Sequence, residues 1–250
     1  MSLLLQKDFM RHLGWPLTKW LVVLLLFWLA LFFSWTSLSA VDFLYPTLYK
    51  QLEIDKTIEK FGPQNRYKRD FSLTSQAEHQ SLFAQIVVAI NRNGTGLSRI
   101  AYHNAQGQII DQLLRPEEVT HLEDVSSLLA TLRNVTAIAA IILVLALGYW
   151  WKKKTYRQFP SVHRAFLAML ALGIVGTTVL ALLGPTEIFY WLHTQIFPAD
   201  HQWFFYYQDS LMTTLMKAPD IFAYIAAFIV TLALVYFAAL VALVRRLICG

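Results

Sequence analysis

The stretch VTAIAAIILVLALGYWWKKK, residues 135–154, decides the fold of this 250-residue chain. It is a nearly unbroken apolar run, close to the roughly 20 residues that a helix needs to cross the hydrocarbon core of a bilayer. Two tryptophans and three lysines end it. Tryptophan is typical of the membrane interface, and lysine beside a span is typical of its cytoplasmic end. The pattern predicts a membrane-spanning helix whose carboxyl end faces the cytoplasm.

Three further runs have the same character: Trp20–Val41, Ala165–Leu183 and Ile221–Val244. They are apolar on every side, unlike a surface helix of a soluble protein, which has one polar face. All the short basic clusters beside the four runs fall on one side of the membrane: Lys7, Arg11, Lys19, Lys152, Lys153, Lys154, Arg157, Arg164, Arg245 and Arg246. The positive-inside rule therefore predicts that both termini are cytoplasmic and that two connecting segments lie outside.

These boundaries predict an all-α membrane protein, a four-transmembrane-helix bundle with a small extracytoplasmic α+β cap formed mainly by the first outer segment. The expected parts follow one another along the chain: residues 1–41 (N-terminus and first span), 42–133 (outer cap), 134–151 (second span), 152–164 (basic cytoplasmic loop), 165–183 (third span), 184–220 (outer interfacial segment) and 221–250 (fourth span and C-terminus).

Composition excludes several classes of function. The net charge of +5 is no sign of nucleic-acid binding, because most of the cytoplasmic excess serves to orient the spans. Mixed charges in the outer segment, such as Lys68 and Asp70, would suit either anionic lipid head groups or a solvated face. The one cysteine, Cys249, allows neither a disulfide within the chain nor a thiolate zinc site.

The first outer segment predicts a cap of helices and one hairpin. Residues 42–60 have the pattern of a helix that continues from the membrane, and residues 71–90 that of a helix or a helix-strand mixture. Residues 98–114 alternate around a turn at 104–107, which predicts a β-hairpin. Pro116 and the two acids after it predict the start of a helix that runs into the second span.

Two histidines in the outer segments are candidates for chemistry. His121 and Asp124 are three residues apart on a predicted helix, so their side chains share a face, and a carboxylate can orient a histidine that acts as a general base. Glu117 could orient His121 in the same way. The alternative interpretation is that His121 forms a solvated salt bridge with these acidic residues. His193 lies between Trp191 and Phe197, where it is either a second catalytic group or an interfacial ring reaching water.

Other catalytic patterns are weak or missing in the sequence. A zinc site is chemically possible from residues of both outer segments: His121, Asp124, His193, and Asp200 or His201. No dense ligand spacing such as H-E-x-x-H supports it, so no metal is expected. The sequence contains neither a glycine-rich phosphate loop nor a G-x-S-x-G elbow.

Taken together, the two histidine segments resemble a known family. Glu118–Val125 resembles the E-x-x-H-L-x-D-V signature of the lipoprotein intramolecular transacylases, which are four-span bacterial membrane proteins. His193–Pro198, followed by Trp203, Phe205 and Pro219–Phe222, resembles the second signature of that family. Both signatures occur in order and at the expected span boundaries, and the resemblance covers essentially the whole chain.

The resemblance implies an acyltransferase of the bacterial cytoplasmic (inner) membrane with its active site at the outer leaflet. Its substrate would be a lipoprotein whose N-terminal cysteine bears a diacylglyceryl thioether, and the enzyme would move the sn-2 acyl chain to the cysteine α-amine. No cofactor is implied, because donor and acceptor belong to one molecule. By analogy, His121 is the base, oriented by Asp124 or Glu118, and His193 is the second catalytic group, with the reverse order of roles also possible. Trp203 and Phe205 would line the acyl site or pack in the core.

Two other functions fit the same sequence. A hydrolase on this scaffold would release the fatty acid to water through the same histidines. A non-enzymatic assembly protein would bind a partner through the cap, and its function would survive loss of the histidines. A transporter fits less well, because the spans carry almost no charge at mid-depth.

Overall fold

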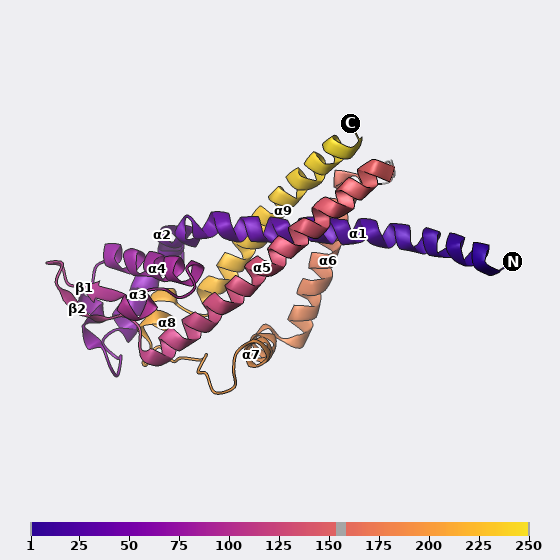
Figure 1. Ribbon diagram of the computed structural model, residues 1–250. Coiled ribbons are helices and arrows are strands. Elements are labelled where there is room, and N and C mark those ends of the chain that lie inside the picture. Colours follow the sequence, from indigo (N-terminus) through magenta and orange to yellow (C-terminus); the bar gives the residue numbers. More distant parts are fainter. Residues whose placement is uncertain (1, 154–158, 250) are drawn as a thin grey trace. The chain divides into compact units, whose positions relative to one another are not determined.

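The computed structural model describes residues 2–153 and 159–249. Four helices in this part of the chain are long and apolar enough to cross a membrane (Figure 1): α1 (Ser2–Ser39), α5 (Pro116–Lys153), α6 (Val162–Leu183) and α9 (Asp220–Cys249). The prediction of four spanning helices is confirmed. Lys154 and Arg157 of the predicted basic loop lie outside the described residues.

Contacts along the chain divide it into two compact units. The first comprises Met1–Trp35, Arg133–Leu182 and Ile229–Gly250; the second comprises Thr36–Leu132 and Leu183–Phe228. The second unit therefore gathers the two segments that the charge pattern places on the same side of the membrane, together with the adjoining ends of the spans.

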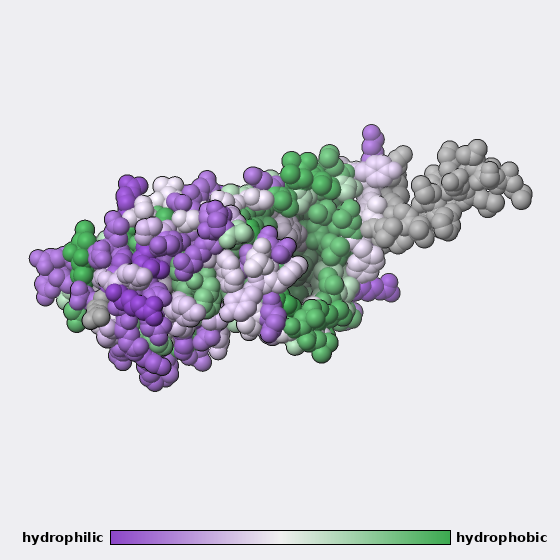
Figure 2. Space-filling view, turned by 90° about the horizontal axis from the view of Figure 1, so that it is seen from below, coloured by the Kyte–Doolittle hydropathy of each residue, from purple (hydrophilic) through white to green (hydrophobic). Residues whose placement is uncertain are grey.

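The first unit is a helical bundle with an apolar exterior. Val23, Ala30 and Phe237 are completely buried between its helices. Trp28 donates to Thr136 Oγ1 at 2.9 Å, which ties α1 to α5. Only 6 % of the most apolar stretch of α6 is buried within the protein, so nearly its whole circumference is left for lipid. Figure 2 shows the resulting concentration of apolar side chains on the surface of the long helices.

The second unit begins with a sharp break after α1. A 3-10 turn (η1, Asp42–Leu44) has positive φ at all three residues, and it is followed by α2 (Tyr45–Gln51) and α3 (Ile54–Phe61). The predicted continuous helix over residues 42–60 is therefore wrong. Pro46 cannot continue a helix that arrives from α1, but it fits the first turn of a new one. Burial of neighbouring side chains such as Tyr45 offsets the strain of the left-handed residues.

The rest of the cap follows the predicted order of helix and hairpin. After the 3-10 turn η2 (Arg69–Leu73), α4 (Gln76–Asn91) forms, with Ser75 capping its first turn. After η3 (Leu97–Arg99), β1 (Ala101–His103) pairs antiparallel with β2 (Ile109–Gln112) in a sheet of two strands. The buried Tyr102 and Leu113 attach the hairpin to the cap, because two strands alone are marginally stable.

The second outer segment supplies two helices. Gly184, with φ of 89°, separates α6 from α7 (Pro185–Ile196), and an irregular stretch leads to α8 (Leu211–Met216). The residues of α8 are buried, and α8 packs on α3 and α4. The hydroxyl of Tyr45 donates to the carbonyl of Leu215 at 2.6 Å, so the two outer segments share one core.

Candidate active site

The structure brings the two predicted histidines together. His121 lies in the second turn of α5, and His193 lies in the last turn of α7. Their ring centroids are 6.4 Å apart and their planes are inclined by 26°. Both rings belong to the second unit and are partly accessible. A reacting group of a substrate could therefore contact both imidazoles at once.

The tautomer of His193 is fixed by its own helix. Its Nδ1 lies 2.7 Å from the carbonyl oxygen of Phe189, one turn earlier in α7. Because a carbonyl can only accept a hydrogen bond, Nδ1 carries the hydrogen. In the neutral ring Nε2 then has a free lone pair, which is the form that a general base requires.

Aromatic rings enclose the two imidazoles. The ring of Phe197 lies 5.0 Å from that of His121 and 5.3 Å from that of His193. Trp203 contacts His193 at 4.8 Å between centroids, and the buried Phe205 lies 6.0 Å from His121. Trp203 and Phe205, for which the sequence left both a place at the acyl site and a place in the core open, therefore each have a ring next to one of the imidazoles. Such an enclosure limits access of water, which strengthens electrostatic interactions inside.

His121 differs from His193 in its hydrogen bonding. Its Nδ1 is buried and has no hydrogen-bond partner among the residues that the structure describes. Burial among aromatic rings favours the neutral imidazole over the charged one. At Nδ1, His121 is therefore held by contacts with neighbouring rings, whereas His193 is held by a hydrogen bond.

Asp124 does not form the hydrogen bond to His121 that the sequence predicts. Its Oδ2 instead accepts from Nδ1 of His201 at 2.7 Å. This hydrogen bond is the main cause that raises the pKa of His201 above its usual value. From the sequence, His201 was considered only as a possible zinc ligand. No local pattern could have revealed this pair, because its partners lie on separate outer segments.

Glu118 is also engaged elsewhere than at His121. Its fully buried carboxylate accepts from the backbone N–H of Arg115 at 2.6 Å and from the hydroxyl of Ser210. The Ser210 oxygen in turn accepts from the backbone N–H of Thr213 at 2.8 Å and caps α8. Glu118 therefore connects the start of α5 to the start of α8. A glutamate at the third helical position is a capping pattern, and this signal was present in the sequence.

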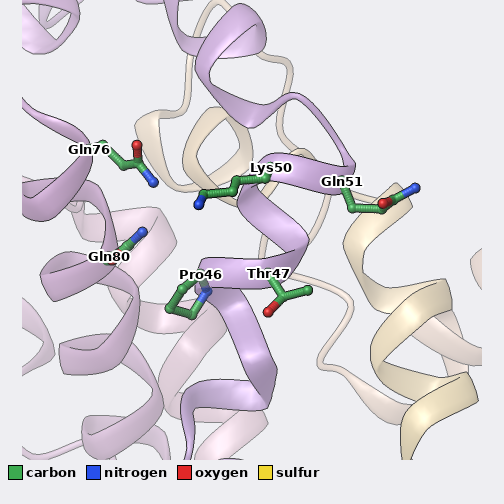
Figure 3. Close-up of a pocket in the computed structure, with 6 residues that line it drawn as sticks. All are labelled: Pro46, Thr47, Lys50, Gln51, Gln76 and Gln80. Atoms are coloured by element: carbon green, nitrogen blue, oxygen red, sulfur yellow. The ribbon is translucent and has the colours of Figure 1, made fainter.

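Cavities open on the second unit in the described part of the chain, among them two of different size. The larger of these two, about 580 Å³, lies between α2 and α4 and is lined mostly by residues with polar side chains (Figure 3): Pro46, Thr47, Lys50, Gln51, Gln76 and Gln80. It shares no residue with the histidine site. The smaller, about 250 Å³, adjoins the site and is lined by residues of α5 and of the end of α7: Asp124, Ser127, Leu128, Thr131, Ile196, Phe197 and Pro198. The candidate site is therefore chosen by its titratable side chains and their neighbours, and not by the volume of the cavity.

The donor set does not favour a metal. Among residues 2–153 and 159–249, no three His, Cys, Asp or Glu side chains are grouped so that they could hold a metal ion. The residues considered for a zinc site are instead paired with other groups, Asp124 with His201 and His193 with the Phe189 carbonyl.

Comparison with solved structures identifies the fold. A structure of the membrane integral lipoprotein intramolecular transacylase Lit from Bacillus cereus, with one histidine changed to arginine, matches with a TM-score of 0.67 and 15% identity. The match covers 97% of this chain and 95% of that chain. A variant with a histidine changed to alanine matches with a TM-score of 0.66 and 16% identity, covering 98% and 97%. No curated protein matches the sequence.

Sequence comparison identifies the family. The model of the family described as lipoprotein intramolecular transacylase Lit matches residues 20–222, which is most of the chain and includes both histidine segments. The resemblance given by the two signatures is thereby confirmed. The chain belongs to the lipoprotein intramolecular transacylase family of bacterial multi-pass membrane acyltransferases, a family that acts on lipoprotein substrates.

Proposed function

We propose that the protein moves the sn-2 acyl chain of a diacylglyceryl lipoprotein to the α-amine of its N-terminal cysteine, with His193 as the base and His121 as the second catalytic group. The observation that carries this assignment is the hydrogen bond from His193 Nδ1 to the Phe189 carbonyl, which leaves Nε2 as the acceptor. It favours His193 over His121 as the base, whereas the sequence left both assignments open.

The reaction requires two proton movements. The substrate α-ammonium first loses a proton to Nε2 of His193, from which it passes to water. The free amine then attacks the ester carbonyl carbon, forming the N–C bond and a tetrahedral oxyanion. His193 takes the second proton from the attacking nitrogen and delivers it to the glycerol oxygen as the C–O bond breaks. The products are an amide and a glycerol hydroxyl, so atoms and charge balance with one proton released.

His121 stabilises the negative charge that develops on the carbonyl oxygen of the ester. A neutral imidazole can donate one N–H to the oxyanion, and such a donor in a site with little water is worth more than in solution. The aromatic enclosure that includes Phe197 and Phe205 limits water, which favours transfer to the amine over hydrolysis. Because amine and ester belong to one molecule, positioning them supplies much of the rate.

The remaining predicted residues have supporting parts in this scheme. Glu118 holds α5 and α8 together and thereby fixes the position of His121. Trp203 lines the wall beside His193 and suits contact with an acyl chain. The site lies at the outer leaflet of the bacterial cytoplasmic membrane, and both termini are cytoplasmic; the one-sided distribution of Lys and Arg supports this orientation.

The test is to express the protein in a bacterium that lacks its own lipoprotein N-acylation enzyme, and to identify the N-terminal lipopeptides by mass spectrometry. Wild type is expected to yield a cysteine with one N-acyl and one remaining O-acyl chain. His121→Ala and His193→Ala are expected to leave the diacyl form. His103→Ala is the matched control, because His103 is half-exposed on the hairpin and pairs with Glu78.

The outcomes separate the competing functions. An unchanged diacyl form with the wild-type protein present in the membrane contradicts the transacylase assignment. Free fatty acid and a lyso-form without N-acylation would instead indicate a hydrolase. Full activity in both histidine variants would rule out the proposed roles of these side chains.

A further inference from the structure

The cavity beside the histidines contains groups that the acyl-transfer steps do not use. It measures about 250 Å³, and its wall on α5 carries the carboxylate of Asp124 and the hydroxyls of Ser127 and Thr131. The rest of its lining is apolar and consists of Leu128 on α5 and Ile196–Pro198 at the end of α7. One side therefore suits a charged group and the other a hydrocarbon or thioether.

Phe197 connects this cavity to the catalytic pair. Its ring lines the cavity and also contacts the imidazoles of His121 and His193, at 5.0 Å and 5.3 Å between centroids. Asp124 lies three residues after His121 on α5, so both side chains share one face of the helix. A group bound to the Asp124 carboxylate would be next to the groups that carry the chemistry.

His201 holds the Asp124 carboxylate in place. Its ring donates through Nδ1 to Oδ2 of Asp124 at 2.7 Å, and this hydrogen bond forms whether the ring is neutral or charged. Within residues 2–153 and 159–249, no other side chain donates a hydrogen bond to this carboxylate. A carboxylate has about four acceptor sites, so capacity for a second donor remains.

We propose that Asp124, positioned by His201, binds the α-ammonium of the N-terminal cysteine of the lipoprotein in this cavity, with the thioether against the apolar wall. This proposal rests on the proposed function and names the part of the site that receives the nucleophile. Ser127 and Thr131 complete the polar wall around the bound N-terminus.

A subsite built on the Asp124 carboxylate selects its ligand by charge. A free α-amino group has a pKa of about 8 and is mainly ammonium at neutral pH. Before transfer the substrate therefore presents a cation to Asp124. After transfer the same nitrogen is a neutral amide, and the carboxylate loses its partner. The subsite thus favours substrate over product, which promotes product release and prevents rebinding of N-acylated lipoprotein.

The experiment measures binding without turnover. The probe is a lipopeptide with two ether-linked chains on glycerol, a thioether to the N-terminal cysteine and a free α-amine; it has no acyl group to transfer. Its partner probe is the des-amino analogue, in which hydrogen replaces the α-ammonium. Affinities of both are measured for the full-length protein in detergent, for wild type, Asp124→Asn, Asp124→Glu and His201→Gln. The matched control is Glu123→Gln, which removes a neighbouring exposed carboxylate that does not line the cavity.

Wild type and Glu123→Gln are expected to bind the free-amine probe about tenfold or more tightly than the des-amino probe, because the des-amino probe leaves the Asp124 carboxylate without its charged partner. Asp124→Asn is expected to bring the ratio within about twofold, Asp124→Glu to restore much of it, and His201→Gln to give an intermediate ratio. An unchanged ratio in Asp124→Asn overturns the proposal, as does the lack of any preference in wild type. Binding of neither probe by folded wild-type protein contradicts the proposed function itself.

Discussion

The imidazoles of His121 and His193 face each other at 6.4 Å between ring centroids, although one belongs to α5 and the other to α7. A gap of this size can admit the reacting atoms of a substrate while each ring remains within hydrogen-bond reach of them. The two side chains are expected to act as a unit, so their substitutions are not independent.

Substitution of both histidines is therefore expected to be non-additive. His193→Ala should lower the rate of acyl transfer by about 100-fold or more, the usual contribution of a general acid–base group. The double variant with His121→Ala should be little slower than the slower single variant. Once one histidine is missing, the other adds little to the rate of transfer. Transfer rates on a synthetic diacylglyceryl lipopeptide provide the measurement. Strict multiplication of the two single effects would show that the histidines act separately.

Loss of the Ser210 hydroxyl is expected to destabilise the second unit. Ser210→Ala removes a donor to the buried Glu118 carboxylate and the cap on the Thr213 N–H. Leaving buried groups without partners costs about 1–3 kcal/mol each. Unfolding in detergent should occur at a lower temperature, while the KM of the remaining folded enzyme changes little. The control is Thr120→Ala on α5, whose half-buried hydroxyl donates only to the Pro116 carbonyl of its own helix.

Acid is expected to destabilise the cap through His79. This buried ring is bonded on both sides, Nδ1 to the Tyr49 hydroxyl at 2.8 Å and Nε2 to the Thr74 hydroxyl at 2.7 Å, and burial lowers its pKa from 6.5 to about 4. Between these two values the unfolded chain binds a proton that the folded state does not, so protonation favours unfolding. This loss of stability is absent above pH 6.5 and grows to about 3 kcal/mol near pH 4.

The measurement is the free energy of unfolding of wild type and His79→Gln between pH 7 and pH 4. Glutamine cannot titrate in this range, so the variant should show a smaller slope whatever its stability at pH 7. Equal slopes would mean that other groups cause the acid sensitivity.

Cys249 offers a direct test of orientation, because it is the one cysteine of the sequence and is predicted to be cytoplasmic. A membrane-impermeant maleimide should not label it in intact spheroplasts and should label it after permeabilisation. In a Cys249→Ser background, Gln106→Cys in the turn between β1 and β2 should be labelled in intact spheroplasts. The reverse pattern would invert the proposed topology and move the active site to the inner leaflet.

The sequence by itself determined the features that depend on local patterns. Run length and hydropathy predicted the four helices. A membrane span must hydrogen-bond its backbone groups within the helix, and it must present apolar side chains to the lipid. Alternation predicted the hairpin, Pro116 predicted the start of α5, and two short signatures predicted the family and the pair His121 and His193.

Only the tertiary structure decided how those residues are connected. The break at Asp42–Leu44 depends on packing that offsets left-handed backbone, which no local propensity reveals. The partners of Asp124 and Glu118 are His201 and Ser210, both on the second outer segment. His121 and Asp124 share a helix face, as their spacing predicts, but Asp124 forms its hydrogen bond with His201, on a segment remote in sequence. Sequence spacing fixes which groups can share a face; the folded chain decides which of them bind one another.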